Sequence, residues 1–190
     1  MSASCKFLQS RRLLDAELEL ALIRIEPANL IKRHGPSYEF EMRHHSKKLA
    51  MGSIRLRINT TRNVRYPGHV GFKVAPKFRG HRYAARSVIL VLPLAVAHGL
   101  KAVWFTTDPD NIASLKTLKL IDARYVDTVR VPVHHKMYLE GERYLRRYKV
   151  DLIKWSLKTQ PAWAAKMRPI CQPANEQNLD RLEAILASKG

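Results

Sequence analysis

The sequence is poor in cysteine, in acidic residues and in long apolar runs, and each shortage excludes a class of protein. The two cysteines, Cys5 and Cys171, lie near opposite ends of the 190 residues, which rules out a disulfide framework or a cysteine-based metal site. The longest apolar run, residues 87–97, contains Pro93 and is far shorter than the ~20 residues that span a bilayer. We therefore expect a cytoplasmic protein with no membrane span and no metal.

Acidic residues are outnumbered by basic ones. Asp and Glu total 16 against 34 Lys and Arg, which gives a formal net charge of +18. The hydrophobic fraction, 46%, is that of a folded domain and not of a disordered basic tail. A positive surface attracts phosphorylated cofactors, nucleic acid or acidic proteins. Charge alone does not choose among these partners.

The apolar pattern predicts an α+β domain. Short alternating stretches indicate strands over residues 18–25, 38–43, 49–58 and 69–74, as in antiparallel hairpins. The pattern then predicts a long helix over 80–98, a strand over 101–106, a helix over 112–120 and strands over 125–131 and 142–152. This order is typical of a mixed, mostly antiparallel sheet flanked by helices.

The two ends of the chain differ from the middle. Residues 1–17 are interpreted as a flexible start, and residues 18–153 as the folded domain. Residues 154–190 are interpreted as a C-terminal extension, a coil followed by a terminal helix over 175–188 with leucines and an isoleucine on one face.

Residues 71–85 carry the strongest chemical signal. A strand runs into a basic, glycine-containing turn, and the turn opens the long helix. The first N–H groups of a helix are unpaired, and the helix dipole is positive there, so such a turn binds anions. Arg79, His81 and Arg82 add side-chain charge. A pyrophosphate is the anion that such a turn fits best.

This segment resembles the GNAT superfamily of acyl-CoA-dependent N-acyltransferases. The family signature is Arg or Gln, two residues, Gly, one residue, then Gly or Ala, and it is matched here by Arg79, by Arg82 in the glycine slot and by Ala84. The sequence Asn-Ile-Ala-Ser at 111–114 resembles the second motif of the family. The ending from residue 137 onward resembles a bacterial subgroup of predicted acetyltransferases.

The resemblance covers residues 18–152 and implies an N-acetyltransferase. A primary amine, on a small molecule or a protein, would attack the thioester of acetyl-CoA directly. The turn would hold the pyrophosphate, the backbone at Val74 would pair with the pantetheine arm, and the Phe72 N–H would stabilise the developing oxyanion. The implied cofactor-binding residues are Phe72, Lys73, Val74, Arg79, Gly80, His81, Arg82, Tyr83, Ala84, Ala85, Asn111 and Ser114.

Three positions depart from the family pattern. Arg82 replaces the middle glycine of the phosphate turn, Leu118 replaces the tyrosine that protonates the leaving thiolate, and Asp122 replaces the glycine after the short helix. A thiol pKa of ~8.5 allows the thiolate to leave without an acid. Asp tolerates a left-handed position better than most residues.

The amine arrives protonated, so the reaction needs a base or a water path. His69, at the start of the strand with the oxyanion donor, is one candidate base, and a hydrogen-bonded structural histidine is the alternative. Glu41, with Glu39 on the same strand face, is a second candidate, and a solvated strand face explains both glutamates equally. Tyr138 is a candidate replacement for the missing acid, or a packing residue.

A function of another class also fits the charge. A basic binding module on the same fold, with little or no turnover, would attach to RNA, to the ribosome or to an acidic protein. Solvated surface explains the basic clusters as well, and a homodimer is compatible with the sequence. The clusters are Arg55, Arg57, Arg62 and Arg65, and Arg143, Arg146, Arg147 and Lys149.

Overall fold

The computed structural model describes residues 13–29, 35–59 and 62–159. The strands are β1 (Leu13–Asp15), β2 (Leu18–Glu26), β3 (Ser37–His44), β4 (Leu49–Arg57), β5 (Val70–Val74), β6 (Ala102–Thr107), β7 (Arg124–Arg130) and β8 (Tyr144–Asp151). The helices are α1 (Tyr83–Ala97), α2 (Ile112–Leu120), α3 (Lys136–Leu139) and α4 (Leu152–Thr159). This is the α+β arrangement of antiparallel sheets and helices that the sequence pattern predicts.

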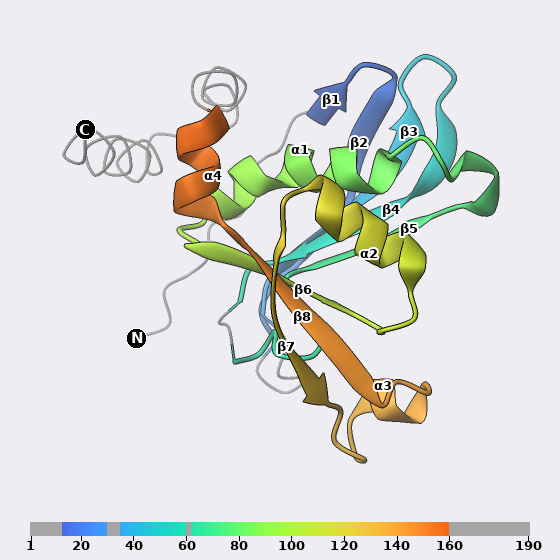
Figure 1. The fold of residues 1–190 in the computed structure, drawn as a ribbon. Helices are drawn as coiled ribbons and strands as arrows, with labels where there is room; N and C mark the ends of the chain where they lie inside the picture. The colour runs from blue at the N-terminus through green and yellow to red at the C-terminus, as the bar shows by residue number, and fades with distance from the viewer. Residues whose placement is uncertain (1–12, 30–34, 60–61, 160–190) are drawn as a thin grey trace.

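The strands form two antiparallel sheets. The first has the order β1-β2-β3-β4-β5, and the second has the order β6-β8-β7. The segment with α1 connects β5 to β6, and the sheets touch where the His69 N–H donates to the Trp104 carbonyl oxygen at 2.7 Å. Figure 1 shows the two sheets meeting near the centre of the molecule and fanning apart from there.

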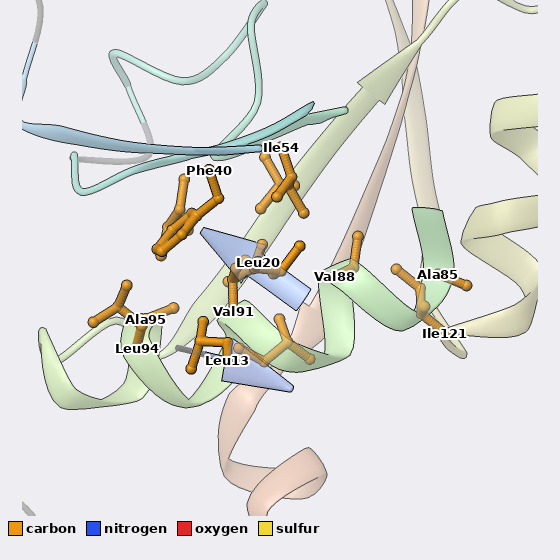
Figure 2. Packing of buried hydrophobic residues seen from close by; sticks show 14 of the residues in the cluster. Leu13, Leu20, Phe40, Ile54, Ala85, Val88, Val91, Leu94, Ala95 and Ile121 are labelled. Carbon is orange, nitrogen blue, oxygen red and sulfur yellow. The ribbon is translucent and has the colours of Figure 1, made fainter. Parts of the chain in front are cut away.

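The core lies between the first sheet and α1. Phe40 and Ile54 are fully buried on the sheet, and they face Val91 and Ala95 of the helix (Figure 2). Val88, Val91, Leu92 and Ala95 recur at helical spacing and enter the core. The second half of α1, residues 91–97, is buried on all sides. The same face of the sheets carries α2 beside α1 (Figure 1). Within the described residues, no helix covers the opposite face of the first sheet, which we call the open face.

Left-handed residues end both helices of this layer. Gly99 has φ +76°, and the Leu100 N–H donates to the Ala95 carbonyl at 3.1 Å, as in a Schellman motif. After α2, Asp122 adopts φ +55° and the Ala123 N–H donates to the Leu118 carbonyl at 3.0 Å. Asp122 therefore does take the left-handed position that glycine occupies in the family pattern.

The ends of the domain differ from the sequence expectation. Leu13–Asp15, expected in a flexible start, pair with β2 because Leu13 is buried in the core. Trp155, expected in a coil, lies in α4, which continues from β8 and packs against the core. The expected terminal helix over 175–188 lies outside the described residues. None of the helices in the described ranges is both long and apolar enough to cross a membrane.

Candidate active site

β5 has one free edge. The Arg57 N–H donates to the His69 carbonyl and the Ala75 N–H donates to the Met51 carbonyl, so odd-numbered residues bond to β4. Residues alternate along an antiparallel pair, and the N–H of Phe72 therefore points away from β4, toward the gap between β5 and β6. The expected oxyanion donor is thus on the free edge.

Residues 75–82 form the turn between β5 and α1, which we call the anion turn after the binding that the sequence predicts there. Gly80 has φ +89°, Arg82 has φ +59°, and α1 starts at Tyr83 with no side-chain cap on its first turn. The first internal bond of α1 runs from the Arg86 N–H to the Arg82 carbonyl at 3.0 Å, so the N–H groups of residues 83–85 have no partner within the helix. Lys77, Arg79, His81 and Arg82 are exposed around these groups.

Two contacts organise the turn. The Arg79 Nε donates to the Val74 carbonyl oxygen at 3.3 Å, so Arg79 lies between the free edge of β5 and the helix end. The His81 ring stacks on the Tyr83 ring with centroids 5.5 Å apart. The turn thus brings together the expected residues Arg79 through Ala85 next to Val74.

Arg82 adopts the backbone conformation of the glycine that it replaces. A left-handed φ costs a non-glycine residue about 1 kcal/mol, and glycine costs a similar amount through its unfolded-state entropy. We therefore expect Arg82→Gly to change the free energy of unfolding by less than about 0.5 kcal/mol, whereas Arg82→Val, which is β-branched, costs about 1–2 kcal/mol. Urea unfolding of both variants measures this difference. Equal stability of the two would contradict a left-handed Arg82.

The N-terminus of α2 borders the other side of the gap. The Asn111 Oδ1 accepts the Ser114 N–H at 3.0 Å, so these two expected residues cap the helix together. Leu118 is 1% exposed in the core. The position of the usual acid is therefore filled by a packing residue.

Arg86 holds the β1–β2 turn against α1. Its Nε lies 2.6 Å from an Asp15 carboxylate oxygen, and its Nη1 lies 2.7 Å from a Glu17 oxygen. The hydrogen bond from Arg86 lowers the pKa of Glu17 to about 2. The carboxylates of both residues are neutralised beside the anion turn. Asp15 and Glu17 lie far from Arg86 along the chain, so no local pattern in the sequence pairs them with it.

The candidate base Glu41 lies on the open face. It pairs with Arg43, and its side chain is about 30% exposed. Glu41 is opposite Ser53 on β4, and Ser53 is opposite Lys73 on β5. Neighbouring strands are ~4.8 Å apart, so Glu41 lies about 10 Å from the strand that carries the oxyanion donor.

His69 is 1% exposed, and both of its ring nitrogens have partners. Nδ1 accepts the Trp104 N–H at 3.0 Å, and Nε2 lies 3.1 Å from the Asn59 carbonyl oxygen. Burial lowers the pKa of His69, and the Arg57 cation acts in the same direction. This arrangement favours the structural alternative for His69 over the base.

Tyr138 lies away from the turn, on α3 at the tip of the β7–β8 hairpin (Figure 1). Its ring packs on a small cluster of Val129, Val131 and Leu145. The Arg143 guanidinium stacks 3.8 Å from the ring centroid, and its Nη1 donates to the Tyr138 carbonyl at 2.6 Å. These contacts favour packing as its role.

Glu142 is a titratable group that no sequence motif marks. It follows α3, one of its carboxylate oxygens is buried without a hydrogen-bond partner, and Asp108 at the end of β6 is its neighbour. Burial raises the pKa of Glu142, and the charge of Asp108 raises it further. No sequence signal pairs these two residues, because the approach of β8 to the end of β6 is a tertiary feature. The described ranges contain no group of three residues that could hold a metal ion.

Comparison with known proteins identifies the family of the chain. The profile of the acetyltransferase (GNAT) domain matches residues 9–124, more than half of the chain. The chain therefore belongs to the GNAT acetyltransferase family, a class that uses acetyl-CoA. No curated protein sequence matches the chain.

Two solved structures show the same fold at low identity. The dodecameric spermidine N-acetyltransferase from Vibrio cholerae is 10% identical, with a TM-score of 0.55, over 77% of this chain and 100% of that one. The ribosomal L7/L12 alpha-N-protein acetyltransferase in complex with coenzyme A is 9% identical, with a TM-score of 0.54, over 74% and 98%. At these identities the likeness is one of fold alone.

Proposed function

We propose that the protein is an N-acetyltransferase that transfers an acetyl group from acetyl-CoA to a primary amine by direct attack on the thioester. The observation that carries this proposal is the continuity of the free β5 edge with the anion turn. The strand donor at Phe72, the carbonyl at Val74 and the unpaired N–H groups of α1 lie along one path. Acetyl-CoA is an arm with a thioester at one end and phosphates at the other.

The residues of the turn fit a phosphorylated cofactor. A Cβ added at Gly80 would meet no atom within 4 Å, so the turn is open on that side. The first turn of α1 offers N–H donors without side-chain competition. Acetyl-CoA supplies the activated acetyl group. The chain supplies the Phe72 N–H, whose contribution as an oxyanion donor is about 3 kcal/mol.

Proton transfer is assigned to the open face. Glu41 is the candidate carboxylate that reaches solvent, and it pairs with Arg43. We propose that it receives the amine proton through water, because about 10 Å is too far for direct contact. With Leu118 in the core, the thiolate leaves without a tyrosine acid, as a thiol pKa of ~8.5 permits.

The acceptor is a small-molecule or protein amine. The two solved neighbours are named for spermidine and for a ribosomal protein, and both names denote amine acceptors. We propose a cytoplasmic location from the cysteine content. Homodimer formation stays a proposal as well.

The basic binding module is the second candidate. The Trp104 ring favours it, because Arg147 and Lys149 lie 5.3 and 5.9 Å from the ring centroid, an arrangement that suits base stacking. Two ion pairs argue against the binding module. Arg55 lies 2.7 Å from Glu39, and Arg147 pairs with Asp127. Part of each predicted basic cluster is therefore already neutralised.

Calorimetry with coenzyme A and a thiol-release assay with acetyl-CoA test the proposal. We expect binding at moderate salt and thiol release with at least one of a polyamine, a lysine peptide or a peptide with a free α-amine. Absence of coenzyme A binding would contradict the proposed acetyltransferase function. The binding module instead predicts RNA affinity that falls steeply with salt, by a slope of about 0.9 or less per phosphate contacted.

A further inference from the structure

His69 joins the two sheets through its backbone and its side chain. Its N–H donates to the Trp104 carbonyl at 2.7 Å, and its Nδ1 accepts the Trp104 N–H at 3.0 Å. His69, just before β5, therefore bonds to both the N–H and the carbonyl of Trp104 in β6. Its Nε2 reaches the Asn59 carbonyl at 3.1 Å, which ties in the loop before β5.

These partners define a single neutral form of the ring. A carbonyl oxygen accepts only, so Nε2 carries the proton, and a backbone N–H donates only, so Nδ1 carries a lone pair. Arg57 is the charged neighbour of the ring, and its cation opposes a second proton there. The ring is engaged at both nitrogens and is 1% exposed.

The close approach is local to this point. A Cβ added at Gly68 would lie 3.0 Å from the Trp104 carbonyl oxygen, so the two backbones nearly touch just before His69. From Val70 onward β5 belongs to one sheet and β6 to the other. His69 thus stands at the apex of the gap, and Phe72 lies three residues further along its edge.

We propose that His69 is a positioning residue that fixes β5 against β6 and so sets the place of the Phe72 N–H in the gap. The catalytic consequence rests on the proposed acetyl transfer. Phe72 lies about 10 Å beyond His69 at strand spacing, so a pivot of about 6° at the apex moves its N–H by about 1 Å. A misplacement of that size costs about 100-fold in rate.

The variants His69→Asn and His69→Gln each keep one of the two side-chain hydrogen bonds of His69 and remove the other. The His69→Asn oxygen lies where Nδ1 was and still accepts the Trp104 N–H. The His69→Gln amide lies where Nε2 was and keeps the bond to Asn59 alone. We expect kcat of His69→Asn to lie within about fivefold of the wild type, and kcat of His69→Gln to be about 100-fold below the wild type. The Kd for coenzyme A should stay within about threefold in both, because the phosphate turn is intact.

A catalytic base gives a different result. If His69 were the base, His69→Asn and His69→Gln would lower kcat equally. Both would also lose the acidic limb of the pH–rate profile. Positioning leaves that limb in place in the Asn variant. Equal loss in both variants with a changed pH profile would overturn the proposal. His98→Gln is the control. His98 is a partly buried histidine whose ring is bonded to the Tyr38 hydroxyl at 2.7 Å, and it lies at the far end of α1. We therefore expect kcat of His98→Gln to be unchanged.

Nitrogen-15 NMR tests the arrangement without turnover. We expect the wild-type His69 ring to be neutral with its proton on Nε2, and the Phe72 and Trp104 amide resonances to move in His69→Gln but not in His69→Asn. A proton on Nδ1, or a charged ring at neutral pH, would overturn the proposal even if the Gln variant fails to fold. If the wild type neither binds coenzyme A nor turns over, the proposed function fails, and these resonances still decide the role of His69.

Discussion

Gly52→Ala destabilises the protein by about 3 kcal/mol or more. A Cβ at Gly52 would lie 2.1 Å from the Lys73 carbonyl oxygen and 3.0 Å from the Val74 Cα. These are backbone atoms of β5, so they cannot swing aside as a flexible side chain would. The strands must separate by more than 1 Å at the stretch that leads into the anion turn. We expect a lower urea midpoint and weaker coenzyme A binding.

Gly71→Ala is the matched control on the neighbouring strand. A Cβ there would meet Arg57 Nη1 at 3.6 Å and Nη2 at 3.9 Å, which is ordinary contact, and the φ of Gly71 lies outside the left-handed region. Alanine there should leave stability unchanged or raise it by up to about 1 kcal/mol, through the entropy of the unfolded chain. If the two variants were equally stable, the close approach of β4 to β5 at Gly52 would be wrong.

Gly80→Asp lowers the affinity for coenzyme A by at least about 100-fold. Gly80 lies in the turn between Arg79 and His81, with space on its open side. On the proposed function, the new carboxylate would stand beside the pyrophosphate. Two unit charges 4 Å apart repel by about 4 kcal/mol at an effective dielectric constant of 20. Calorimetry at low and moderate salt measures the loss, which should shrink as salt rises.

Gly80→Asn separates charge from backbone strain. Asn has the size of Asp and tolerates a positive φ equally well, so both variants bear the same cost of φ +89°. We expect the two to have the same unfolding free energy, and Asn to bind coenzyme A within about tenfold of the wild type. Equal affinities for Asp and Asn would show that no anion binds at this turn.

The local features of the site were predictable from the sequence. The anion turn follows from a strand, basic residues and a helix in succession, and the resemblance supplied the glycine slot. Arg82 shows the strength of that inference, because its φ of +59° is the conformation the slot requires. The strand over residues 69–74 was also predicted, and its register places the Phe72 N–H on the free edge.

Contacts between distant segments were not predictable. His69 was a candidate base because its position and ordinary pKa suit one, whereas its bonds to Trp104 and Asn59 depend on how the sheets meet. Arg86 likewise meets its two carboxylates on β1 and in the β1–β2 turn, far away along the chain. β1 itself was missed because three residues are too few for a period, although the burial of Leu13 holds them in place.

Different groups of strand β5 face different neighbours. Its odd-numbered amides hold β4, its even-numbered amides face the gap, and the side chain of Lys73 faces the open side of the sheet. On the proposed function the free edge handles the acyl group, so substitution of Lys73 alters the open face without moving the backbone that takes part in transfer. Such modularity would let this face change under selection while the backbone of the edge stays the same.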